Sequence, residues 1–268
     1  MIFLDYLLSF NYFFVTLCPI KSFCDSSSVG RALASQAKGR GFEPRLSLKM
    51  FRNNWQIFVI FVFIILAVLD FVPIPFPARM IFPLLWLSIC ALVQKQWALT
   101  AALFFSFLGD VMGWKNELIP QIGFFALAQI LYIIIFSLLM PPKPTWSKPV
   151  KVILFLLVAM VYGVAMFWIF PRVKDNIVSY GIAVYALLLL GMCYAALQHK
   201  NVCLILGAVL FVISDFTLGV HLFVERIPHG HMSIMIPYYM GQLLLYLGTL
   251  RCRQSSTRTR AFIIRPVR

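Results

Sequence analysis

Two aspartates lie inside apolar segments, where a charged side chain is costly. Asp215 interrupts GAVLFVISDFTLGV, and Asp110 lies near the end of a segment that closes with SFLGDVMG. A carboxylate at the centre of a membrane helix costs about 2.5–3.5 kcal/mol on insertion scales, and such residues usually face the bundle interior. Gly207 and Gly219 share a helical row with Asp215 and would let a neighbouring helix approach closely. No Lys or Arg is expected at the depth of Asp215, so we expect this carboxyl group to be neutral and able to donate a proton.

Polar side chains in other apolar segments could share a cavity with these aspartates. Gln129 and Tyr132 share one face of an expected helix, and Tyr238 and Gln242 share one face of another. A single partly wet cavity explains these groups more simply than several separate buried polar defects. The candidate catalytic residues are Asp110 and Asp215, and the candidate substrate-binding residues are Gln129, Tyr132, Ser214, Tyr238, Tyr239 and Gln242.

Structural explanations remain open for several of these residues. Asp110 could be a helix-end carboxylate in the headgroup region. Gln129 and Tyr132 could form an interhelical hydrogen-bond pair, which their spacing alone favours. Tyr238 and Tyr239 would suit an aromatic belt at the membrane surface.

The composition identifies the class of protein. The chain is 62% hydrophobic and 12% charged, whereas soluble domains are about 45–50% apolar and about 25% charged. The net charge of +14 comes from loops and the tail, which indicates contact with anionic headgroups and not nucleic acid. His229 and His231 resemble part of a metal site, but no third ligand follows at a recognisable spacing. We therefore expect no metal and no cofactor.

The sequence predicts an all-α, polytopic membrane helix bundle with about eight transmembrane helices. A spanning helix needs about 20 mostly apolar residues. Lys and Arg concentrate in the loops and tail on one side, so both termini should be cytoplasmic. We expect a multi-pass protein of a bacterial inner membrane. The expected spans cover residues 55–72, 78–94, 97–113, 119–140, 150–170, 177–197, 202–223 and 234–250.

The first 49 residues do not match the rest of the chain. Residues 25–47 are polar and rich in Gly, Ser and Arg, and they resemble the conceptual translation of a serine tRNA gene. We expect residues 1–49 to come from an over-long reading frame with the true start at Met50; the alternative is a signal anchor with a flexible leader. The rest divides into an eight-helix transmembrane domain, 50–251, and a basic cytoplasmic tail, 252–268.

Four motifs together resemble the YhhN-like membrane proteins, whose animal members are lysoplasmalogenases. The motifs are FSFLGDVMG, GFFALAQILYIIIF, GAVLFVISDFTLGV and PYYMGQLLLYLG. The resemblance covers about residues 50–251, including the eight-span layout. Many relatives have a histidine where this chain has Gln129, and an amide cannot transfer a proton. The family's polar positions fall on Asp110, Tyr132, Asp215, Tyr238, Tyr239 and Gln242.

The resemblance implies a hydrolase that cleaves the vinyl ether bond of lysoplasmalogens, giving a fatty aldehyde and a glycerophospho-alcohol. Such a bond hydrolyses by protonation of an alkene carbon, and water captures the resulting oxocarbenium ion. Two carboxyl groups in different environments can divide these roles. We expect Asp215 to be the acid and Asp110 to stabilise the cation, although the roles could be reversed.

Two other classes of function compete with this interpretation. A transporter or lipid-handling protein could use the same intramembrane acids, but no inverted repeat or matched pair of broken helices is evident. A serine hydrolase is poorly supported, because the chain has no GxSxG motif. The expected partners are a lysophospholipid or related lipid and the bilayer.

Overall fold

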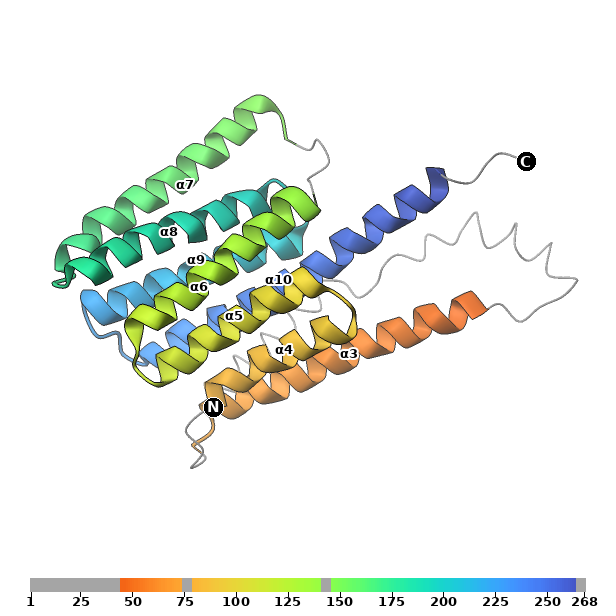
Figure 1. Ribbon diagram of the computed structural model, residues 1–268, viewed down its shortest axis with the longest axis horizontal. Helices are drawn as coiled ribbons and strands as arrows, with labels where there is room; N and C mark the ends of the chain where they lie inside the picture. Colours follow the sequence, from red (N-terminus) through yellow and green to blue (C-terminus); the bar gives the residue numbers. More distant parts are fainter. Residues whose placement is uncertain (1–43, 74–78, 141–145, 264–268) are drawn as a thin grey trace, which may run out of the picture. The chain divides into compact units, whose positions relative to one another are not determined.

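The computed structural model describes residues 44–73, 79–140 and 146–263, and these are helical without any strand (Figure 1). The predicted start at Met50 concerns residues 1–49, most of which lie outside this part of the chain. The chain divides into two units within α3 (Pro44–Phe71), after Phe58. In the first unit the helical backbone is described from Pro44 onward. All contacts below lie in the second unit, Val59–Arg268.

The expected all-α membrane fold is confirmed, since each of the eight expected spans falls on an α-helix. Ile135–Leu139 continues α6 as a π-helix, and short 3-10 turns at Arg79–Ile81 and Phe170–Arg172 precede α4 and follow α7. The α-helices are α3 (Pro44–Phe71), α4 (Phe82–Val93), α5 (Trp97–Trp114), α6 (Leu118–Ile134), α7 (Lys148–Trp168), α8 (Asn176–Leu197), α9 (Val202–Phe223) and α10 (Gly230–Ile263).

Six of these helices are long and apolar enough to cross a membrane: α3, α5, α6, α7, α8 and α9. The second expected span is shorter, because its first residues form the 3-10 turn and α4 itself has 12 residues. The eighth expected span lies in α10, which has Pro237 in its interior and carries Tyr238, Tyr239 and Gln242 among its apolar residues. The orientation of the two termini remains a prediction.

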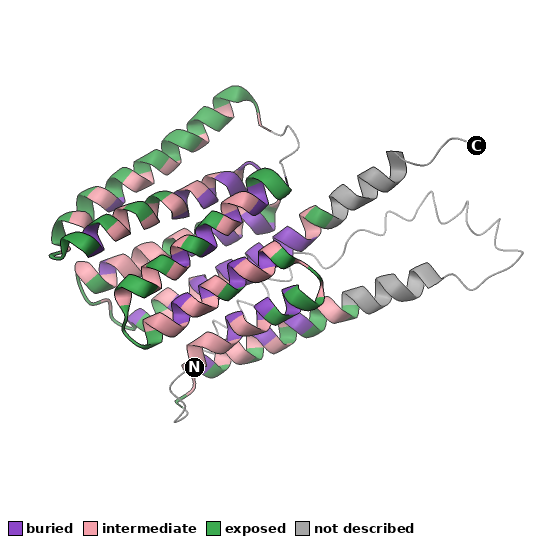
Figure 2. Cartoon of the chain, viewed as in Figure 1, coloured by how far each residue is buried: buried purple, intermediate pink, exposed green. Residues whose placement is uncertain are grey.

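Neighbouring helices position the candidate site. In Val59–Arg268, α9 packs along α10, and α5 packs against both α4 and α6. α8 packs against α6, α7 and α9. Figure 2 shows that few residues of α7 are buried; Ala165 is the buried residue within α7 itself. Most of α7 is therefore an apolar surface suited to lipid.

The crossing of α9 and α10 depends on Gly207 of α9 and Gly241 of α10. A Cβ atom on Gly207 would lie 2.9 Å from the backbone nitrogen of Leu245 and 3.0 Å from the carbonyl oxygen of Gly241. This confirms that Gly207 lets a neighbouring helix approach closely. Gly219 instead faces a side chain, since its Cβ would lie 2.9 Å from Cδ1 of Ile169.

Candidate functional site

Asp110 is held by a tyrosine from another helix. It lies near the end of α5, where it is 4% exposed. The hydroxyl of Tyr238 on α10 is 2.9 Å from Oδ1 and 3.1 Å from Oδ2 of Asp110. Phe125 and Phe211 contact the Tyr238 ring edge-on. These aromatic contacts hold the Tyr238 ring in the position from which its hydroxyl donates to Asp110.

Asp215 has an equivalent partner on α8. The hydroxyl of Tyr185 donates a hydrogen bond to Oδ2 of Asp215. Ser214, the preceding residue, donates instead to the backbone carbonyl of Ile234 at 2.8 Å and so links α9 to α10. The sequence prediction missed Tyr185. The available signal was a tyrosine in the middle of an apolar span, the same signal that identified Tyr132.

A buried hydrogen-bonded chain joins α5, α6 and α10. Tyr132 donates to Oε1 of Gln242 at 2.9 Å, and Nε2 of Gln242 donates to Ser106 at 3.3 Å. All three side chains are fully buried. Tyr132 therefore pairs with Gln242 and not with Gln129. The amide of Gln129 is also fully buried, but it has no hydrogen-bond partner of normal geometry among the described residues.

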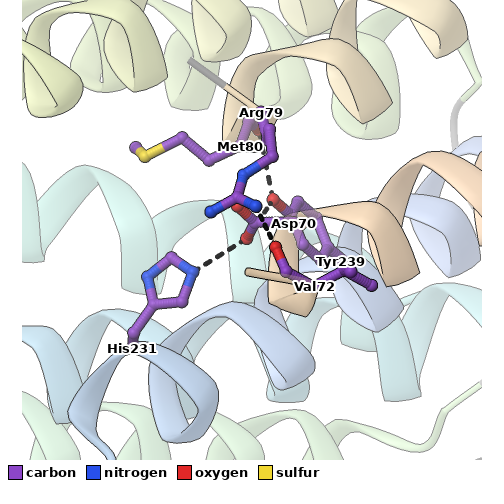
Figure 3. A network of polar contacts seen from close by, with 6 residues as sticks. All are labelled: Asp70, Val72, Arg79, Met80, His231 and Tyr239. Atoms are coloured by element: carbon purple, nitrogen blue, oxygen red, sulfur yellow. Dashed lines mark hydrogen bonds and ion pairs between the residues drawn. The ribbon is translucent and has the colours of Figure 1, made fainter. Parts of the chain in front are cut away.

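A third aspartate, Asp70, organises a network near the start of α10 (Figure 3). Nε2 of His231 lies 2.9 Å from Oδ2 of Asp70. The hydroxyl of Tyr239 lies 3.0 Å from the same oxygen and 3.1 Å from the carbonyl oxygen of Met80. Arg79 points at the carbonyl of Val72 and holds the chain where it leaves α3.

Sequence reasoning missed Asp70, although it ends an apolar span as Asp110 does. Tyr238 and Tyr239 were both predicted to bind substrate. In the structure they hold different carboxyl groups, because adjacent residues of a helix point in directions about 100° apart.

One cavity contains both predicted catalytic carboxyl groups, and we call it the acidic cavity. Its volume is about 540 Å³, and its wall includes Asp110, Asp215, Ser214, Tyr238 and His231. No Lys or Arg is among the described residues that line it. The other predicted site residues do not line this cavity; they are Gln129, Tyr132, Tyr239 and Gln242.

The arrangement is suited to proton transfer and to stabilising positive charge. Two carboxyl groups from different helices face one space, and each accepts a hydrogen bond from a phenol. No Lys or Arg of the described wall neutralises them. Within the described ranges, no three His, Cys, Asp or Glu side chains are grouped closely enough to bind a metal ion.

Comparison with known proteins places this chain in a family. The chain is 30% identical to lysoplasmalogenase TMEM86B of Homo sapiens over 154 residues, which are 57% of this chain and 63% of that protein. It is 30% identical to lysoplasmalogenase TMEM86B of Sus scrofa over 56% of this chain and 62% of that protein. Lysoplasmalogenase TMEM86A of Bos taurus is 24% identical over 57% of this chain and 65% of its own length.

The matched region thus spans slightly less than two thirds of these curated relatives. No solved structure matches the chain significantly. Residues 53–249 match the profile of the YhhN family, and this region contains both aspartates of the cavity and all of their described hydrogen-bond partners. The chain is therefore an integral, multi-pass membrane protein that belongs to the YhhN family.

Proposed function

We propose that this protein hydrolyses the vinyl ether bond of a lysoplasmalogen. The observation that carries the proposal is the pairing of Asp110 and Asp215 on the wall of one cavity whose described lining contains no Lys or Arg. The names of the curated relatives support the same activity. The products would be a fatty aldehyde and a glycerophospho-alcohol, and the setting would be a bacterial inner membrane.

The reaction needs a proton donor and an anion in one place. The acid transfers its proton to the alkene carbon farther from the ether oxygen, and the electron pair of the double bond forms the new C–H bond. The cation left behind is shared between carbon and the ether oxygen. Water adds to that carbon and loses a proton to a carboxylate, and the hemiacetal then breaks its C–O bond to release aldehyde and alcohol. A well-placed acid or base accelerates such steps by about 10²–10⁴.

We assign proton donation to Asp215 and stabilisation of the cation to Asp110. An apolar environment without a cation favours the neutral form of a carboxyl group, and a neutral acid is the form that donates. Tyr185 would orient Asp215, and Tyr238 would orient Asp110. The two carboxyl groups would divide acid and anion roles as the pair in glycosidases does.

The remaining predicted residues would act at a distance from the substrate. Gln242 and Tyr132 would fix α10 against α6, which sets the position of Tyr238. Tyr239 would fix the start of α10 through Asp70. Gln129 has no contact with the cavity, so we assign it no proton-transfer role.

The test is Asp215→Asn, purified in detergent and assayed for aldehyde release from a lysoplasmenylethanolamine. The rate should fall by about 10²–10⁴, the contribution of a general acid. A matched control is Asp175→Asn, because Asp175 caps the start of α8 through Ile177 and Val178 and asparagine caps equally well. Near wild-type activity in folded Asp215→Asn would remove Asp215 from catalysis.

A transporter is the second candidate, because the acidic cavity could also bind a proton or a polar solute. Liposomes containing the protein distinguish the two functions. Uptake of lysolipid without aldehyde formation would support transport, whereas aldehyde formation at the rate found in detergent would support hydrolysis.

A further inference from the structure

A second, apolar pocket adjoins the acidic cavity. It lies among α6, α7, α8 and α9, has a volume of about 110 Å³, and is lined chiefly by aliphatic and aromatic side chains. We call it the apolar slot. Its wall includes Val161 of α7, Ala186 of α8 and Val212 of α9. Among the described residues of this wall, Asp215 is the one with an ionisable carboxyl group, and Gln121 and Tyr185 are the other polar side chains.

The slot and the acidic cavity meet at Asp215. Both spaces are lined by Asp215, Phe125 and Gln121, and by the end of α9 near Leu222. Asp110 lines the acidic cavity but not the apolar slot. The two carboxyl groups are therefore not equivalent: one stands at the boundary between apolar and polar space, and the other stands wholly on the polar side.

This boundary matches the chemistry of a vinyl ether lipid. The alkene carbon that must accept the proton is the second carbon of the hydrocarbon chain, and the ether oxygen, one carbon farther on, begins the polar glycerol part. A donor at the junction of an apolar and a polar space reaches that carbon when the chain lies in one space and the headgroup in the other.

We propose that the apolar slot binds the first part of a single hydrocarbon chain, with the glycerophospho headgroup in the acidic cavity and the vinyl ether at Asp215. This inference rests on the proposed function for the reaction, but the chain site can be tested without turnover. It also resolves the division of roles, because Asp110 lies on the side of the headgroup and water.

The size of the slot limits what it binds. Ligand pockets of proteins commonly have about 300–1,000 Å³, so a slot of about 110 Å³ suits part of one chain and not two chains. Each methylene that the slot buries should raise kcat/KM by up to about fourfold, the limit for a methylene that leaves water, since burial of one contributes about 0.8 kcal/mol. The gain should stop once the chain extends beyond the slot.

The first test fills the slot with Ala186→Phe. The matched control is Ala159→Phe, because Ala159 is an exposed residue of α7 and does not line the slot. Lysoplasmenyl substrates of short and long chain are compared in mixed micelles at fixed detergent concentration. The long-to-short ratio of kcat/KM should fall at least tenfold in Ala186→Phe and stay unchanged in the control. An unchanged ratio in folded Ala186→Phe would overturn the proposal, and Ala186→Leu makes the same comparison if the larger side chain prevents folding.

The second test needs no catalysis. A saturated 1-alkyl lysophosphoethanolamine with a diazirine near the ether end of its chain is photolysed on the wild-type protein and on both phenylalanine variants. Cross-linked peptides should come from the slot-lining parts of α6, α7, α8 and α9 in the wild-type protein and the control, and should be lost in Ala186→Phe. Cross-links confined to other helices would refute the chain site. Cross-links in the slot, together with no aldehyde release from the vinyl ether substrates of the first test, would retain the chain site and reject the hydrolase.

Discussion

Replacing Gly207 by alanine should loosen the pair of helices that carries the candidate site. Gly207 lies where α9 crosses α10, and an added Cβ would be 2.9 Å from the nitrogen of Leu245 and 3.0 Å from the oxygen of Gly241. Both are backbone atoms, which cannot rotate aside as a side chain can. The two helices must therefore move apart, and they carry Asp215 and Tyr238.

Two opposing contributions set the size of the effect. Alanine is more favourable than glycine inside a helix by about 0.5–1 kcal/mol, whereas overpacking a close contact costs about 1–3 kcal/mol. Gly163→Ala on α7 isolates the first contribution, because a Cβ there meets nothing within 4 Å. The free energy of unfolding should therefore be about 1–3 kcal/mol lower in Gly207→Ala than in Gly163→Ala.

The assay is reversible unfolding of both variants in the same detergent, followed by circular dichroism, together with aldehyde release below the unfolding transition. Gly163→Ala should be as stable as the wild type or slightly more so. Gly207→Ala should be less stable and less active, since Asp215 and Tyr238 shift relative to one another. Equal stability of the two variants would contradict the close packing on which this reasoning depends.

Three further predictions address individual contacts. Tyr185→Phe removes the hydrogen bond to Asp215, and the aldehyde-release rate should fall about 2–12-fold if that bond contributes about 0.5–1.5 kcal/mol to the transition state; an unchanged rate would remove Tyr185 as a positioning residue. Asp70→Asn weakens the contact of Asp70, which does not line the cavity, with His231, which does; thermal stability should therefore fall while kcat changes by less than tenfold, and a loss as large as that of Asp215→Asn would instead make Asp70 catalytic. Burial lowers the pKa of His199 below its usual value of 6.5, so the unfolded state binds the proton more readily and stability should decline as pH falls below about 6.5; His199→Gln should flatten this dependence in unfolding measurements between pH 5 and 8.

Most of the fold could be predicted because the signals are local. The length of an apolar run and its punctuation by proline or polar residues are read directly from the chain, and the seventh expected span coincides with Val202–Phe223. The second span was less well defined because Pro83 lies at the start of α4 and a 3-10 turn precedes it. α10 continues to Ile263, well past the expected span, because loss of hydropathy marks the end of a span and not of a helix.

The partners of the site residues were harder to predict. Sequence spacing places Tyr238 and Gln242 on one face of a helix, but it does not say which helix that face meets. Asp70 and Tyr185 were missed for this reason. Their importance comes from contacts with α10 and α9, which depend on how the helices pack and rotate against one another.

The absence of Lys and Arg from the described wall of the acidic cavity has a consequence for substrate choice. Ester hydrolysis builds negative charge on oxygen and relies on donors or cations that stabilise an oxyanion. Vinyl ether hydrolysis builds positive charge instead. A wall with two carboxyl groups would favour the second transition state and repel the first. Two lysolipids with the same chain and headgroup would then be distinguished by the sign of the charge that each reaction creates, with no difference in shape required.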